Sequence, residues 1–150
     1  MVIKRHFILG FSKVPTSPNG IKTVVMKFAN QMRNLQKESI LKAKSSKEKF
    51  SLIFDEWTSN RNRRYINIIL NGKKINKNLG LVRISGRLPA EKCLELVRNR
   101  IDNYELNLER DILCLTTDGA SVMTKIGKIS PTFQQLCLAH GIQLAIIDVL

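Results

Sequence analysis

Two short stretches decide the fold: residues 50–57, FSLIFDEW, and residues 114–123, CLTTDGASVM. Each is an apolar run rich in residues that favour β-strands, and each reaches an aspartate, Asp55 in the first and Asp118 in the second. Two buried strands that end on carboxylates can bring them side by side at one edge of a sheet. The pattern therefore predicts an α/β domain with an acidic pair at that edge.

Further strands follow from the same kind of pattern. The four predicted strands cover residues 50–55, 64–71, 78–85 and 111–118. The first three are joined by short connections, one of them with the turn signal Asn71-Gly72, so we expect an antiparallel meander. In this arrangement the first and fourth strands lie adjacent.

Three helices are expected around these strands. Apolar residues recur every three or four positions over 21–43, which predicts a basic amphipathic helix. Its apolar face could pack on the sheet as a brace, or the helix could lie on DNA or a membrane surface. Pro89 opens a second helix over 90–104, and Pro131 opens a last one that runs to residue 150. The expected order of the domain is β-β-β-α-β-α.

Charge is distributed unevenly along the 150 residues, whose net charge is +13. The first 50 residues contain 11 of the 25 Lys and Arg but only 2 of the 12 Asp and Glu. We therefore expect a basic lead-in and helix over 1–49, followed by a folded domain over 50–150. Such a charge points to a polyanionic partner or to an acidic membrane surface.

Several classes of protein are disfavoured by the composition. The three cysteines form no CxxC pair, so neither a disulfide framework nor a zinc site is expected. No apolar run is long enough to cross a bilayer, and the N-terminus lacks the features of a secretory signal. We expect a soluble intracellular protein without a membrane partner.

Asp55 and Asp118 are the candidate metal ligands. Two carboxylates held close together repel each other unless a cation lies between them, which suggests Mg²⁺. Such a site can promote phosphodiester chemistry on a polyanion. The alternative is that each aspartate forms a turn or caps a helix, as the Asp118-Gly119 pair readily does.

Other candidate residues flank this pair. Trp57 shares a strand face with Asp55, and the turn that follows contains Arg61, Arg63 and Arg64, which could contact phosphates. Each also has a purely structural interpretation, as a core aromatic or as solvated arginines.

Cys137 and His140 stand three positions apart on the expected last helix, so they share a face. They could be a buried thiol and a hydrogen-bonded core histidine, or His140 could donate to DNA.

The residues also carry a resemblance to a known family. FSLIFDEWTSNRNRRYINI, NLGLVRISGRLPAEKCLELV, LTTDGASVM and QLCLAHGIQLAIIDVL occur in this order over residues 50–150. Together they resemble the catalytic domain of hAT-superfamily DNA transposases, the Hermes, Activator and Tam3 type. The resemblance implies an RNase H-like mixed sheet, Mg²⁺- or Mn²⁺-dependent DNA strand cleavage and transfer, and a nuclear protein.

The resemblance also assigns roles to residues. Asp55 and Asp118 match the first two metal-binding and catalytic aspartates of the family. Trp57 matches a residue near the active site that stacks on a base of DNA. Cys137 and His140 match the family's CxxH motif, which is associated with the handling of a flipped base.

Parts of the family pattern are not matched in this sequence. The family's third acidic ligand is a glutamate far downstream, and neither Glu91 nor Asp148 corresponds to it. The N-terminal zinc finger and the C-terminal dimerisation segment are also unmatched. We therefore expect a truncated, inactive catalytic domain that is incomplete at its C-terminus and lacks the strand that would cover the fourth. The alternative is a non-catalytic nucleic-acid-binding protein, and a decayed pseudogene product is a third possibility.

Overall fold

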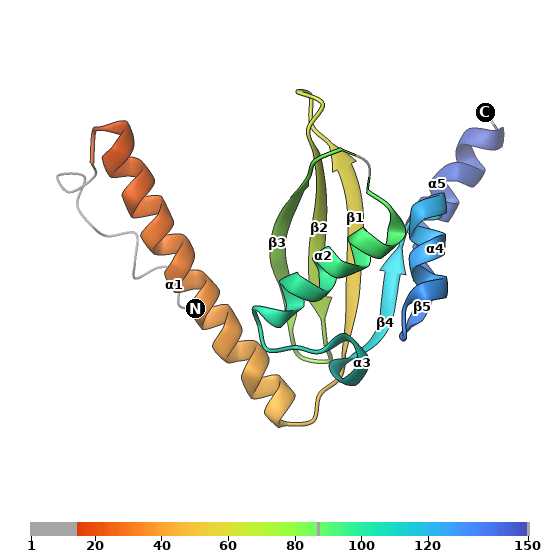
Figure 1. The fold of residues 1–150 in the computed structure, drawn as a ribbon, viewed down its shortest axis with the longest axis horizontal. Helices are drawn as coiled ribbons and strands as arrows, with labels where there is room; N and C mark the ends of the chain where they lie inside the picture. The colour runs from red at the N-terminus through yellow and green to blue at the C-terminus, as the bar shows by residue number, and fades with distance from the viewer. Residues whose placement is uncertain (1–14, 87, 150) are drawn as a thin grey trace. The chain divides into compact units, whose positions relative to one another are not determined.

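The computed structural model describes residues 15–86 and 88–149, shown as a ribbon in Figure 1. Contacts divide the chain into two compact units between Glu38 and Ser39, so the predicted division after residue 49 falls inside the second unit. Most of the predicted basic lead-in lies outside the described residues. Among the helices described, none is long and apolar enough to cross a membrane.

The predicted amphipathic helix is present as α1, which spans Pro18–Ser45. Apolar residues of its first-unit part are 42% to 57% exposed, namely Ile21, Val24, Val25, Phe28, Met32 and Leu35. The packing of this face on the sheet therefore stays a prediction. In the second unit the last turns of α1 bury Ile40 and Ala43 in the core.

The second unit is built on a five-stranded mixed sheet with the order β3-β2-β1-β4-β5. Its strands are β1 Phe50–Thr58, β2 Arg64–Asn71, β3 Asn76–Ile84, β4 Ile112–Thr117 and β5 Phe133–Leu136. The first three pair antiparallel as a meander, whereas β4 pairs parallel with β1, and β5 parallel with β4. The α/β class, the first four strands and the β1–β4 adjacency are confirmed.

Besides the end of α1, the described residues of the second unit form four helices, of which α2 crosses one face of the sheet (Figure 1). They are α2 Ala90–Asp102 and α4 Ser121–Ile129, with the short α3 Leu108–Asp111 before β4 and α5 Leu138–Val149 after β5. An ion pair of 2.7 Å between Glu91 and Lys125 joins α2 to α4. Helix α2 buries Cys93, Leu94 and Val97 against the sheet, as its helical periodicity predicts.

Alternation along the strands separates a buried face from a half-exposed one. On β1 and β2 the core residues are Phe50, Leu52, Phe54, Ile66, Ile68 and Leu70. The residues between them, among them Ile53, Asp55 and Asn67, are half-buried or exposed. A strand covered by helices on one face is expected to alternate in this way. The acidic pair and its neighbours therefore lie on or near the half-exposed face.

The sequence-based prediction for residues 121–137 was wrong. Instead of a turn followed by a helix from Pro131, the chain forms α4, then β5, and only then α5 from Leu138. The strand expected to be missing beside the fourth is therefore present as β5, and it covers that edge of β4. The prediction failed because β5 has only four residues, two of them glutamines, and lacks the alternation that identifies a strand.

Gln134 of β5 supplies the tertiary contacts that fix this region. Its side-chain amide donates to the hydroxyl of the buried Thr117 in β4 at 2.8 Å and to the carbonyl of Met123 in α4 at 2.7 Å. The side chain lies directly against Gly127, so that a Cβ added there would meet the Cβ of Gln134 at 2.9 Å. One glutamine thus joins two strands to a helix, and it requires a glycine in that helix.

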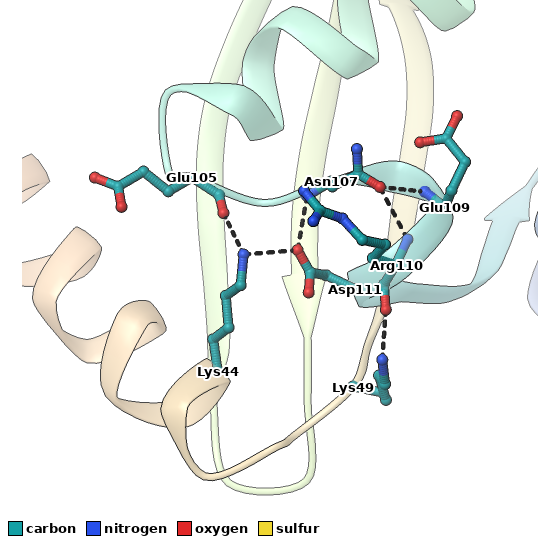
Figure 2. Close-up of polar contacts among 7 residues, drawn as sticks. All are labelled: Lys44, Lys49, Glu105, Asn107, Glu109, Arg110 and Asp111. Atoms are coloured by element: carbon teal, nitrogen blue, oxygen red, sulfur yellow. Dashed lines mark hydrogen bonds and ion pairs between the residues drawn. The ribbon is translucent and has the colours of Figure 1, made fainter.

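The opposite end of β4 is fixed by a polar cluster around Asp111, drawn in Figure 2. Lys44 Nζ, from the last turn of α1, lies 2.9 Å from Asp111 Oδ2 and donates to the carbonyl of Glu105 at 2.6 Å. The backbone N–H of Asn107 also donates to Asp111 Oδ2, and the Asn107 side chain caps α3. Lys49 donates to the carbonyl of Arg110. These bonds tie the chain before β1 to the chain before β4.

Asp111 is charged in this cluster although it is only 8% exposed. Burial alone would raise the pKa of its carboxyl group. The hydrogen bonds from Lys44 and from the backbone of Asn107, together with the charges of Lys44 and Lys49, outweigh burial and leave the pKa below its ordinary value. The ionised carboxylate therefore stabilises the folded state.

We expect Gly127→Ala to destabilise the protein by about 2 kcal/mol, because the new methyl group overlaps the Gln134 side chain. Gly141→Ala in α5 is the matched control: it also replaces a helical glycine, but its Cβ meets nothing within 4 Å. Urea denaturation should show the control unchanged or up to about 1 kcal/mol more stable. Equal effects of the two substitutions would contradict the Gln134 contact.

Asp111→Asn should cost about 1–2 kcal/mol at neutral pH, because it removes the ion pair with Lys44. A lowered folded-state pKa means that this contribution is complete above the unfolded pKa, near 3.8, and is lost as the pH falls through the folded value. Denaturation of both proteins from pH 7 to pH 3 should show their difference shrinking below about pH 4. The exposed Asp102→Asn is the control, and a difference that grows on acidification would refute the assignment.

Candidate functional site

The candidate site lies near the C-terminal ends of the parallel strands β1 and β4. Their paired residues include Leu52 with Leu115 and Ile53 with Thr116. Two residues further along each strand, this register brings Asp55 level with Asp118. Paired strands are about 4.8 Å apart, so this register, continued beyond its last pair, puts the two residues close together. That their carboxylates share one ion stays a prediction.

Asp55 lies within β1 rather than at its end, and its side chain is exposed. Its partner across the antiparallel β1–β2 pair is Asn67, so these two side chains share the half-exposed face. The Oδ1 atom of Asn67 is buried and has no hydrogen-bond partner, a condition reached by no other side-chain N or O atom of the described residues. Asp55 thus has Asp118 on one side and an unpaired amide oxygen on the other.

Asp118 follows directly on β4, and its position is fixed by the turn it makes. Its Oδ1 accepts a hydrogen bond of 3.0 Å from the backbone N–H of Ala120, one residue before α4 begins. The turn-forming interpretation of Asp-Gly is therefore correct as local structure. It does not exclude a metal, because a carboxylate can accept several bonds at once. The N-terminus of α4 also favours negative charge at this point.

The oxygen donors at this edge are of the type that Mg²⁺ and Mn²⁺ prefer, namely carboxylates and an amide carbonyl. The described residues contain no group of three or more His, Cys, Asp or Glu that could hold a metal ion. The acidic part of the site is therefore the pair Asp55 and Asp118. The unpaired Asn67 oxygen is the observation that fits a cation beside them.

Trp57 lies two residues beyond Asp55 in β1, on the same face and 41% exposed. It pairs with Tyr65 of β2, and the two rings stack with their centroids 5.0 Å apart and their planes 24° from parallel. Tyr65 was not predicted as a site residue. Counting back from the hairpin turn would have found it, because antiparallel partners are equidistant from the turn.

The hairpin between β1 and β2 presents two of the three predicted arginines. Hydrogen bonds from Ser59 N–H to the Arg63 carbonyl and from Asn62 N–H to the Ser59 carbonyl, both 2.8 Å, close the turn. Asn62 adopts the left-handed conformation that such a turn requires. An open hollow of about 570 Å³ lies against it, lined by Trp57, Thr58, Ser59, Asn60, Arg61, Arg63 and Tyr65.

Arg64 does not line this hollow. Its guanidinium pairs with Glu56 at 2.5 Å and donates to the carbonyl of Gly86 at 3.1 Å. The hydrogen bond with Glu56 is the main cause that raises the pKa of Arg64 above its ordinary value. In the structure this arginine connects β1, β2 and the segment after β3.

Cys137 and His140 are both half-buried at the start of α5. Cys137 precedes the helix rather than lying inside it: its N–H donates to the Thr117 carbonyl at 2.7 Å, and its carbonyl accepts from Gly141. Both residues thus follow the end of β5, at the same edge of the sheet as Asp118. Cys93 is buried in the core. This burial is the main cause that raises the pKa of its thiol to about 11, and the charge of Glu56 adds to it.

No protein-family model matches the chain, and no curated protein matches it. The resemblance to hAT transposases, which is carried by the four motifs and their order, stays a prediction.

Proposed function

We propose that this chain is part of a DNA-processing domain of the RNase H-like class, of the hAT transposase type. In this proposal Asp55 and Asp118 hold a divalent metal ion beside a DNA strand. The observation that supports the proposal is the parallel register of β1 and β4, which brings the two aspartates level when it is continued by two residues. An antiparallel meander of three strands, followed by a fourth strand parallel to the first, also supports the RNase H-like assignment.

Bound Mg²⁺ or Mn²⁺ supplies the chemistry of this class, activating a water or a 3′-hydroxyl and stabilising the leaving oxygen. The residues of the chain bind and orient the reactants. Asp118 is held in place by its bond to the Ala120 N–H, and Asp55 by the β1–β2 ladder. Asp55 is therefore positioned by a strand, and Asp118 by the turn that follows β4.

The aromatic pair and the hairpin arginines are the proposed DNA contacts. The stack of Trp57 on Tyr65 leaves Trp57 partly exposed, so a base can extend the stack. Arg61 and Arg63 are exposed beside it and suit phosphate contacts. Arg64 is not included in this proposal, because its guanidinium already pairs with Glu56.

A second candidate function is DNA binding without strand cleavage. It is favoured by the net charge of +13 and by the hollow next to Arg61 and Arg63, neither of which needs a metal. The two candidates differ only at Asp55 and Asp118, which a purely binding protein would not require.

Arg61→Ala and Arg63→Ala should each weaken binding of a short single-stranded DNA, and each should lower the slope of log affinity against log salt by about one. Arg110→Ala controls for the loss of one charge, because Arg110 is exposed and lies before β4, at the other end of the strands from the hairpin. Fluorescence anisotropy over a salt series measures all three. Equal effects of the three substitutions would remove the hairpin from the proposed interface.

Cleavage of a DNA duplex in Mn²⁺ is expected to be weak at most, because the family's third acidic ligand is unmatched in this sequence. Any such cleavage should fall by roughly 100-fold in Asp55→Asn and in Asp118→Asn, since each removes a proposed ligand. Asp102→Asn, an exposed aspartate at the end of α2, should cleave like the wild type. A gel assay of cleaved ends measures the rate, and anisotropy confirms that each variant still binds DNA. Binding with no cleavage by the wild type would favour the second function.

A further inference from the structure

The side-chain oxygen Oδ1 of Asn67 is unusual because it is buried in the sheet without a hydrogen-bond partner. Buried acceptors in folded proteins almost always have a hydrogen-bond donor, and one without a donor calls for an explanation such as a water or an ion. Within the described residues no other side-chain N or O atom is both buried and unpaired. The atom belongs to β2, an interior strand of the sheet. The residues on either side of Asn67 in this strand, Ile66 and Ile68, point to the opposite face and are buried in the core.

The residues around Asn67 on its own face do not supply the missing donor. Across β1 it faces Asp55, whose carboxylate oxygens are acceptors, and across β3 it faces Leu81, which is apolar. Along β2 its neighbours on the same face are Tyr65 and Ile69. The Tyr65 ring is stacked on Trp57. Asn67, whose Oδ1 has no donor, and Asp55 are therefore direct cross-strand partners.

Three oxygen-bearing side chains form a row across adjacent strands at this level of the sheet. Asn67 on β2 is directly opposite Asp55 on β1, and the β1–β4 register brings Asp118 level with Asp55 on the other side. Adjacent strands are about 4.8 Å apart, so Asn67 and Asp118 lie about 10 Å from each other on either side of Asp55, and one ion could contact all three residues only from a position over β1. A divalent cation accepts a neutral amide oxygen beside carboxylates.

We propose that Asn67 Oδ1 is the third oxygen ligand of the cation held by Asp55 and Asp118. This inference rests on the proposed function, because it takes the metal between the two aspartates as given. It explains in one step why the amide oxygen lacks a donor and why two carboxylates are held together. It also gives the site a third protein ligand, a neutral amide oxygen.

The test measures binding of Mn²⁺ alone, through the loss of the electron paramagnetic resonance signal of the free ion. The melting temperature of the metal-free protein is measured in parallel. Asn67→Val suits a strand and removes the oxygen, so we expect the Mn²⁺ dissociation constant to rise about 10-fold. The same variant should melt at a higher temperature without metal, because it removes a buried acceptor that has no partner. Asn67→Asp should instead tighten Mn²⁺ binding.

Asn71→Val is the matched control, since Asn71 lies on the same strand and the same face but pairs with Ser51 at the far end. It should change neither Mn²⁺ binding nor the effect of Mn²⁺ on melting.

The outcomes separate the two proposals. If Asp55→Asn abolishes Mn²⁺ binding while Asn67→Val and Asn67→Asp bind as the wild type does, the role of Asn67 is overturned and the metal site stands. If the wild type binds no Mn²⁺, or Asp55→Asn binds it equally well, the metal site itself fails. A lower melting temperature for metal-free Asn67→Val would mean that the amide donates to Asp55 instead, which also overturns the inference.

Discussion

The register of β4 on β1 is the constraint on which the candidate site depends. The ladder contains an irregularity: Phe50 pairs with Ile112, but Ser51 pairs with Cys114, so that Leu113 is an extra residue. Without it, Asp55 would be level with Thr117, and Asp118 would be out of step by one residue. A shift of one residue moves a side chain to the other face of a sheet, so this bulge is what makes the two aspartates neighbours.

Both ends of β4 are held by polar contacts that preserve this register. At its start, Asp111 and the carbonyl of Arg110 are bound by Lys44 and Lys49 from the chain that leads into β1. At its end, Gln134 binds the Thr117 hydroxyl, one residue before Asp118. The bulge residue Leu113 lies between these two anchors and is 55% exposed, so it gains little from burial. The anchors, rather than the bulge itself, must therefore keep the register fixed.

Much of the fold could be predicted from the sequence because most of its elements have a clear period. The first four strands and α1 and α2 follow from alternation and from helical spacing. The segment of α4 and β5 was missed for two different reasons: α4 has a helical period through Met123 and Ile126 that was overlooked beside the turn signal before it, whereas β5 is short and polar and has no clear period. Strand β5 is held by tertiary contacts of Gln134, which no local pattern reveals.

The same distinction applies to the candidate site. Asp55 and Asp118 were predicted as neighbours because both follow obvious strands. Tyr65 and Asn67 were missed, although both are fixed by the hairpin register that pairs them with Trp57 and Asp55. Reading the hairpin as pairs of residues, and not only as two strands, would have identified both.

The spacing along β1 separates two tasks that the proposed function requires. Asp55 and Trp57 are two residues apart on one strand face, which corresponds to about 7 Å at the rise of a β-strand. Phosphates follow one another about every 3.4 Å along the axis for each strand of DNA. A base stacked on Trp57 would therefore place the backbone one or two nucleotides away beside the acidic pair. In the proposed function the carboxylates would repel phosphate, so Arg61 and Arg63 at the hairpin would bring the strand to this face and a cation would hold it there.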